Sequence, residues 1–345
     1  MMKKIIRNAL WFILVSFPLH AADDAAEKQL ADEVRSKGWI VFSARTEAGD
    51  WDLFACRPDG SQKKNLTSTP ATNEGYALIS RDGVRMLYRK TKRDEVFDGN
   101  HYGGQGELML AKSDGTEAKA LGGTGELPWA SWSPDGKQIA TLSLKGIAFI
   151  DIESGQTVRT LKRSGFFQQL IWSPDGKWLC GVSNAFGASW QDARMNAETG
   201  EGNAVSLEDC CTPDWFPDSK RMIYSNRQLK EGNKGYGWTQ LWMANADGTE
   251  LRLVYAQEGR HVYGGHVSPD GKYVLFTGNA QENGDSKNAG SPMGVIRLSG
   301  APIIIGESKT AREKNPQGKS GPVLKLPAGW EPCWTLHEIF PLLKE

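Results

Sequence analysis

The sequence has no net charge, few cysteines and, after its first residues, no long hydrophobic run. Its 345 residues include 41 basic and 41 acidic side chains, which argues against a protein that binds duplex nucleic acid, because such proteins usually carry a basic excess or face. No C-x-x-C pair is present, so neither a redox motif nor a zinc ribbon is indicated. The five cysteines are Cys56, Cys180, Cys210, Cys211 and Cys333. Their pairing stays open, and their odd number leaves at least one thiol over if every disulfide forms within the chain.

Sequence motifs of common catalytic sites are missing as well. There is no Gly-x-Ser-x-Gly nucleophile elbow, and Gly318-Lys319-Ser320-Gly321 does not match one. The stretch Gly103 to Gly106 lacks the lysine and the helix that a phosphate-binding loop needs. We therefore predict no cofactor and no resident metal, and favour a protein without catalytic activity.

The first residues are typical of an export signal. Lys3, Lys4 and Arg7 precede the short apolar run 9–17, and Leu19-His20-Ala21 is a plausible cleavage site. We expect residues 1–21 to be a signal peptide, residues 22–37 a short helix or tail, and the mature protein to be periplasmic or secreted. The apolar run is too short to span a bilayer, so we expect no membrane span after signal removal. An uncleaved anchor is the alternative.

A tetrapeptide repeat is the most informative feature that is present. Ser-Pro-Asp-Gly begins at Ser133, Ser173 and Ser268, and degenerate copies begin at Ser80 and Phe216. The aspartates of the five copies are 53, 40, 43 and 52 residues apart, a spacing typical of repeat architectures. Apolar runs flank each copy, which predicts a β-hairpin whose turn is built by proline, aspartate and glycine. We expect these aspartates to form turns rather than to act in catalysis.

A second turn follows in each unit, so that each unit contains four short strands, a to d. This turn is found at six places: 59–61, 114–116, 153–155, 198–200, 247–249 and 299–300. Four-stranded units of this length are propeller blades. The sequence thus predicts an all-β, six-bladed propeller over residues 38–345, whose blades are four-stranded and antiparallel. Tryptophans that end the a strands, such as Trp132 and Trp215, are expected to pack between blades.

The first blade lacks an a strand of its own. The segment from Trp39 to Leu66 provides only strands b, c and d, whereas Glu331 to Thr335 resembles the a strand at Thr212 to Phe216. We therefore expect the C-terminal strand to pair with the N-terminal one, because closure removes the two open edges of a linear array.

The pattern Trp-Ser-Pro-Asp-Gly-Lys, followed by an apolar strand and later by Asp-Gly-Thr, resembles TolB-like propeller repeats. The resemblance is best over 130–142, 170–182 and 240–254. It implies the fold but says little about function, since such repeats occur in periplasmic scaffold proteins, peptidases and sugar-polymer lyases. The α/β domain that precedes the propeller in TolB has no room between the expected cleavage site and the first strand. We also expect no hydrolase domain after the repeats.

The variable loops indicate where a ligand binds. The b–c connections differ widely in length, whereas the a–b turns are uniform, and variable loops on a rigid scaffold usually carry the binding residues. We therefore predict that the face formed by the b–c and d–a loops binds a protein or a polysaccharide, and we expect a monomer. The candidate binding residues are His101, Tyr102, Trp190, Tyr236, Trp238, His261, Tyr263 and Trp330. The competing interpretation is that such aromatic residues only hold loops in place.

An enzyme is the alternative hypothesis. Oligogalacturonate lyases are propellers with a histidine-rich metal site, and this chain could be a polysaccharide lyase or hydrolase. The residues that would have to converge at the channel mouth are His101, His261, His266, Gln169 and Glu331. His261 and His266 are five residues apart, which places them on opposite faces of a strand unless Gly264-Gly265 forms a bulge.

Overall fold

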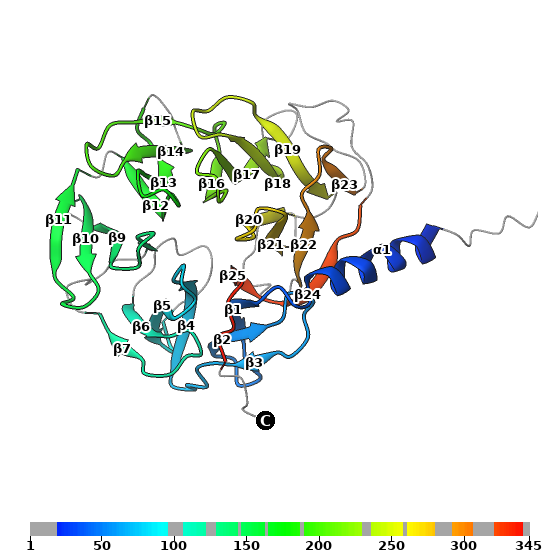
Figure 1. Cartoon of the computed structure of the whole chain (residues 1–345), viewed down its shortest axis with the longest axis horizontal. Helices are drawn as coiled ribbons and strands as arrows, with labels where there is room; N and C mark the ends of the chain where they lie inside the picture. Colours follow the sequence, from blue (N-terminus) through cyan, green and yellow to red (C-terminus); the bar gives the residue numbers. More distant parts are fainter. Residues whose placement is uncertain are drawn as a thin grey trace, which may run out of the picture.

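The computed structural model describes residues 19–95, 106–121, 129–143, 146–162, 165–186, 190–229, 236–257, 261–279, 292–305 and 321–340. These residues form one helix and six β-sheets arranged as blades around a central axis (Figure 1). The all-β, six-bladed propeller predicted from the repeats is confirmed. The helix α1, Leu19–Val34, lies outside the ring. No described helix has the length and apolar character needed to cross a membrane.

Each blade runs from an innermost strand a to an outermost strand d. The a strands are β25 (Trp330–Thr335), β4 (Thr72–Ile79), β8 (Ala130–Trp132), β12 (Phe166–Trp172), β16 (Cys210–Trp215) and β20 (His261–Val267). The b strands are β1 (Trp39–Arg45), β5 (Arg85–Lys92), β9 (Gln138–Ser143), β13 (Trp178–Ser183), β17 (Arg221–Leu229) and β21 (Tyr273–Asn279). The c strands are β2 (Trp51–Cys56), β6 (Glu107–Lys112), β10 (Gly146–Asp151), β14 (Gln191–Asn196), β18 (Tyr236–Asn245) and β22 (Pro292–Arg297). The d strands are β3 (Lys64–Asn65), β7 (Lys119–Ala120), β11 (Thr157–Leu161), β15 (Gly202–Ala204), β19 (Arg252–Gln257) and β24 (Leu324–Ala328). We number the blades 1 to 6 in this order.

The repeated tetrapeptide forms the a–b turn as predicted. In each of the five copies, the aspartate accepts a hydrogen bond from the backbone N–H two residues later, at 2.8 to 3.1 Å. Where the first residue is serine, its hydroxyl also donates to this aspartate, as Ser133 does to Asp135 at 2.7 Å. The glycine has positive φ, +69° at Gly136, a conformation that costs glycine little. The aspartate carboxylates therefore stabilise the a–b turn.

The blade 6 sheet departs from the prediction. The turn at Ser299-Gly300 was expected to connect its c and d strands. Instead, the strand that follows it, β23 (Ile303–Ile305), pairs in parallel with β19 and adds a fifth strand to blade 5. The d strand of blade 6 is β24, which pairs with β22. A Ser-Gly turn motif predicts that the chain reverses direction, but it does not determine which sheet edge the next strand joins.

The ring closes within blade 1 as predicted, because β25 pairs with β1 in an antiparallel register that sets Ile40 opposite Trp334. Residues beyond β25 add to the closure. The Trp39 indole donates to the Glu338 carboxylate at 2.9 Å, and Arg57 forms an ion pair with the same carboxylate at 2.6 Å. Buried Ile339 joins the apolar cluster between blades 1 and 2. Both ends of the propeller thus belong to one sheet.

Apolar clusters fill the spaces between neighbouring blades. Trp132 and Trp215 are 8% and 4% exposed, and their indole N–H groups donate to the carbonyls of Leu78 and Ile171 on the preceding blade, at 2.9 and 3.4 Å. The prediction that these tryptophans pack between blades is confirmed. Buried aromatic side chains of this size dominate core energetics. All five cysteines lie in the described residues and none forms a disulfide.

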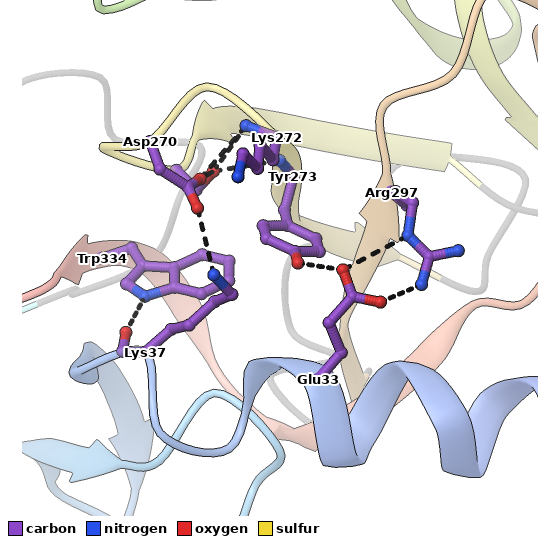
Figure 2. A network of polar contacts seen from close by, with 8 residues as sticks. Glu33, Lys37, Asp270, Lys272, Tyr273, Arg297 and Trp334 are labelled. Carbon is purple, nitrogen blue, oxygen red and sulfur yellow. Dashed lines mark hydrogen bonds and ion pairs between the residues drawn. The ribbon is translucent and has the colours of Figure 1, made fainter.

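Helix α1 packs against blade 6 near the closure (Figure 2). Leu30 and Val34 are fully buried in the cluster that includes Tyr273. The Glu33 carboxylate accepts hydrogen bonds from the Tyr273 hydroxyl and the Arg297 guanidinium. The backbone N–H of Lys325 in the outer strand β24 donates to Glu27 at 3.0 Å. The helix therefore covers part of an exposed sheet edge. It begins at Leu19, within the residues that the sequence assigns to the signal peptide.

Candidate functional site

The central channel contains a cavity between the a strands. It encloses an empty space of about 640 Å³, part of which is open to solvent. Its lining residues are Tyr76, Ala77, Leu78, Leu87, Arg89, Leu108, Trp129, Ala130, Gln169, Leu170, Ile171, Thr212, Pro213, His266, Glu331 and Pro332. A second cavity shares Leu78, Ile171 and His266 with the first and extends to the Ser-Pro-Asp-Gly turns. The two cavities therefore follow the channel toward its a–b face.

The first cavity lies at the height of a β-bulge in the a strands. In the described part of the chain, five of the six a strands shift register at the same place. A residue with positive φ stands there in each, four positions before the first residue of the a–b turn. These residues are Tyr76, Gln169, Thr212, Gly264 and Glu331, with φ between 47° and 58°. Trp129 is the corresponding residue of blade 3. Bulges redirect side chains, and non-glycine residues in this region of φ are strained and gather at functional sites.

Two of the bulged side chains connect neighbouring blades. The Gln169 carbonyl oxygen Oε1 accepts the backbone N–H of Thr212 at 2.5 Å. The Thr212 hydroxyl in turn accepts the backbone N–H of Gly264 at 3.1 Å. These bonds satisfy backbone N–H groups that the bulge removes from the hydrogen-bonding pattern of the sheet. The Gln169 Oε1 and the Thr212 hydroxyl therefore already stabilise the fold.

Residues two positions after the bulge form a second set of links. Ser131 Oγ accepts the Trp172 N–H at 2.7 Å, and Asp214 Oδ2 accepts the Val267 N–H at 2.9 Å. Cys333 Sγ is 3.5 Å from the Ile79 N–H in the same arrangement. Each bond crosses from one blade to the next around the ring.

His266 is a titratable residue of the channel that interacts with the carboxyl groups of Asp214 and Glu331. Its Nδ1 is 3.7 Å from Asp214 Oδ2, and its side chain is 18% exposed. Burial lowers the pKa of His266, but the nearby carboxylate of Asp214 outweighs this effect and raises the pKa above the ordinary value. Burial raises the pKa of Glu331, and the charge of His266 opposes that increase. The protonated imidazolium is thus stabilised within the cavity.

Arg89 and two aromatic rings form the wall on the side of blade 2. Arg89 is 3% exposed, and its guanidinium lies over the Tyr76 ring at 5.4 Å from the centroid. Burial lowers the pKa of Arg89, yet an arginine keeps its charge in proteins. The Tyr76 and Trp129 rings pack edge to face at 5.4 Å. A permanent cation therefore lines a largely apolar cavity.

The predicted binding residues lie elsewhere, as far as the structure describes them. His261 is 2% exposed, its Nδ1 accepts the Thr239 N–H at 3.1 Å, and its ring stacks on Tyr263 at 6.0 Å. Trp190 is half-buried and packs edge to face on Phe167 at 5.2 Å. Trp330 is half-buried at the start of β25. None of these described candidates lines either of the two cavities.

The other candidates lie outside the residues that the structure describes in full. His101 and Tyr102 are not described, and for Tyr236 and Trp238 only the backbone is. Of the residues considered for an enzyme, Gln169, His266 and Glu331 line one cavity, whereas His261 does not. The bulge at Gly264, with φ of 58°, replaces the simple alternation expected between His261 and His266. Among the described residues, no group of three or more histidine, cysteine or acidic side chains could hold a metal.

The sequence prediction missed Tyr76, Arg89 and Asp214. Tyr76 could have been found by its position, because it stands four residues before Ser80 just as Gln169 stands four before Ser173. Asp214 could have been found two positions after Thr212 in the same way. Arg89 lies on a b strand, and no repeat position distinguishes it from an exposed arginine.

Comparison with known proteins supports the fold. No protein-family model and no curated protein matches the chain. Among solved structures, TolB from Acinetobacter baumannii is 16% identical, with 95% of this chain and 75% of that chain covered and a TM-score of 0.58. The chain folds as a TolB-like β-propeller. A structure of the nidogen/laminin complex is 12% identical, with 76% and 90% covered and a TM-score of 0.53. At these identities, the likeness to TolB concerns the fold alone.

Proposed function

We propose that this TolB-like propeller is an exported, non-catalytic protein that binds a protein partner and takes a segment of it into the central channel. The observation that carries the proposal is the cavity at the bulges, which combines an apolar lining with a few directed polar groups. Ligand sites are usually lined by apolar side chains with a few precisely placed polar groups. The signal-like residues 1–21 support export to the periplasm or beyond.

The lining favours a protein segment over a sugar polymer. Nine of the sixteen lining residues are aliphatic or proline: Ala77, Leu78, Leu87, Leu108, Ala130, Leu170, Ile171, Pro213 and Pro332. Apolar side chains of a partner gain free energy when they leave water for such a surface. Sugar hydroxyls would lose their hydrogen bonds to water there, which costs free energy unless new partners replace them.

The loop face remains part of the proposed site. Tyr263 and Trp330 stand one residue before the bulged positions Gly264 and Glu331, on the side where β20 and β25 begin. A partner that enters from the b–c and d–a loops would pass them before it reaches the cavity. We extend the proposal to the other predicted aromatic residues: replacing both Tyr236 and Trp238 by alanine should weaken binding and leave stability unchanged.

A cavity-filling variant tests the proposal. Ala130 lines the cavity and is 7% exposed, so Ala130→Trp should fill the space and displace a bound segment. Ala120→Trp places the same side chain on the exposed outer strand β7 and is the matched control. Wild type and the control should capture the same partner from an envelope extract by crosslinking, and the cavity variant should lose it. Equal capture by both variants, with equal melting temperatures, would contradict the proposal.

A polysaccharide lyase or hydrolase is the second candidate. The observation that favours it is that His266 and Glu331 line one cavity, with Asp214 3.7 Å from His266 Nδ1. An oriented histidine and a carboxyl of raised pKa can exchange protons with a substrate. Purified protein would be assayed on uronate and neutral polysaccharides for new double bonds and reducing ends. Turnover that disappears in His266→Ala, while the fold is retained, would establish the enzyme in place of the binding protein.

A further inference from the structure

Two hydrogen-bonding atoms in the channel cavity have no partner within the part of the chain that the structure describes. Nε2 of His266 and Nε1 of Trp129 are both buried, and neither has a hydrogen-bond partner among the described residues. Both side chains line the cavity at the bulges. A buried polar atom without a partner costs free energy, so each of these atoms would gain from a ligand that supplies the missing bond.

Both atoms can donate a hydrogen bond to an acceptor that enters the cavity. An indole N–H can only donate, and a protonated imidazole donates from both nitrogens. Asp214 lies 3.7 Å from Nδ1 of His266 and favours the protonated ring, in which Nε2 carries a hydrogen. Arg89, which can also only donate, lines the same cavity. The cavity thus presents donors from three different blades.

We propose that the channel cavity binds a carboxylate of the protein partner, the side chain of an aspartate or glutamate that is flanked by apolar residues, through Trp129, His266 and Arg89. This inference rests on the proposed function and names the group that the cavity recognises. A carboxylate has two oxygens that accept several hydrogen bonds, and charge-assisted bonds of this kind are the strong ones. The surrounding leucines and prolines would contact the flanking apolar side chains.

The acidic groups in the cavity do not prevent this binding. Both oxygens of Asp214 already accept backbone N–H groups, from Trp215 at 2.8 Å and from Val267 at 2.9 Å. Burial raises the pKa of Glu331, which favours its neutral form, and a neutral carboxyl can donate to the ligand. The side-chain oxygens of Gln169 and Thr212 are held by the links between blades.

Peptide probes of matched shape test the inference. We would titrate the protein with acetyl-Leu-Leu-Glu-Leu-Leu-amide, with the same peptide carrying glutamine, and with a short oligouronate, by calorimetry. The glutamate peptide should bind at least about tenfold more tightly than the glutamine peptide, because hydrogen bonds to a charged group are worth that much in affinity. Equal binding of the two peptides, or tighter binding of the oligouronate, would overturn the inference.

Variants of two tryptophans locate the contact. Trp129→Phe removes the N–H donor and keeps an aromatic ring, so it should remove most of the preference for the glutamate peptide. Trp242→Phe is the matched control, because it also removes a buried indole N–H, one that donates to Gln240 and lies outside both cavities. His266→Asn should reduce affinity for the glutamate peptide. A preference that survives both Trp129→Phe and His266→Asn would overturn the inference.

The experiments separate this inference from the function on which it rests. If the two peptides bind equally well, and Ala130→Trp abolishes both, the channel binds protein segments but does not recognise a carboxylate. If neither peptide binds and Ala130→Trp also leaves partner capture unchanged, the proposed function itself is wrong. If neither peptide binds but capture depends on the cavity, only the carboxylate inference is overturned.

Discussion

The indole nitrogen of Trp39 donates a hydrogen bond of 2.9 Å to the carboxylate of Glu338, which lies 299 residues further along the chain. This bond belongs to the closure of the ring, together with the pairing of β1 and β25. Buried Trp334 also donates to the Lys37 carbonyl at 2.7 Å, so the two ends of the propeller support one another at several points.

Removal of the closing strand should therefore unfold the whole propeller. A chain that ends at Gly329 loses β25 and the buried side chains of Trp334 and Ile339, and each large buried side chain contributes several kcal/mol, about 3–5 for a tryptophan. Thermal unfolding by circular dichroism should show no cooperative transition near that of the full chain. Leu336→Ala, at a residue that is 44% exposed, is the control and should melt as the wild type does. A truncated chain that melts as late and as sharply as the full one would refute the closure.

The aspartates of the repeat should contribute to stability through their turns. Asp135→Ala removes the acceptor for Ser133 and for the Lys137 N–H, and we expect it to cost about 1 kcal/mol, a typical value for a net hydrogen bond. Asp135→Asn keeps an acceptor oxygen and should cost less. Urea unfolding of the two variants measures the difference. Equal stability of Asp135→Ala and wild type would show that the turn needs only its proline and glycine.

Glu33 should stabilise the docking of helix α1 in a pH-dependent way. The hydrogen bond to Arg297 and that to Tyr273 lower the pKa of Glu33. A lowered pKa in the folded state means that the stabilisation is present above the ordinary glutamate pKa and is lost as the pH falls through the folded value. Since Glu33 is 36% exposed, we expect Glu33→Gln to cost at most about 1 kcal/mol. Urea unfolding at a series of pH values should show this cost vanish on acidification.

The hydrophobic side of α1 gives a contrasting variant. Leu30 is fully buried in the core cluster near blade 6, so Leu30→Ala should cost about 2–5 kcal/mol at every pH. A cost for Glu33→Gln that stays constant from neutral to acidic pH would contradict an electrostatic role for Glu33.

The pKa of His266 should depend on Asp214. The nearby carboxylate of Asp214 raises this pKa, so Asp214→Asn should lower it. A raised folded pKa contributes stability that is present below the ordinary histidine value and is lost as the pH rises through the folded value. Asp214→Asn should therefore remove a pH-dependent part of stability on the acidic side of this range. Nuclear magnetic resonance titration of the imidazole measures the pKa, and Asp175→Asn, in an exposed turn, is the control. An unchanged pKa in Asp214→Asn would refute the coupling.

The fold could be predicted because one local motif determines it repeatedly. Each Ser-Pro-Asp-Gly copy places a turn between two apolar runs, and the incomplete first unit indicates that Trp330 to Thr335 closes the ring. The partner of the strand after Ser299-Gly300 was predicted wrongly, since a turn signal reports local backbone shape and not the edge that a strand joins.

The cavity was harder to predict than the fold, for reasons of backbone geometry. A bulge brings Gln169, His266 and Glu331 into one cavity, yet Gln169 and Glu331 are residue types that normally avoid positive φ. No residue preference signals a bulge at these positions. Arg89 is buried because of the tertiary packing around blade 2, which no local pattern near Arg89 reveals.

Because the bulge occurs at one height on five of the six described a strands, the channel presents one variable residue from each blade at that level on an otherwise constant frame. Tyr76, Trp129, Gln169, Thr212, Gly264 and Glu331 occupy these six places. Evolution could exchange the side chains that form no link between blades and so redirect the same ring toward a new target, whereas a change of Gln169 or Thr212 would also break such a link.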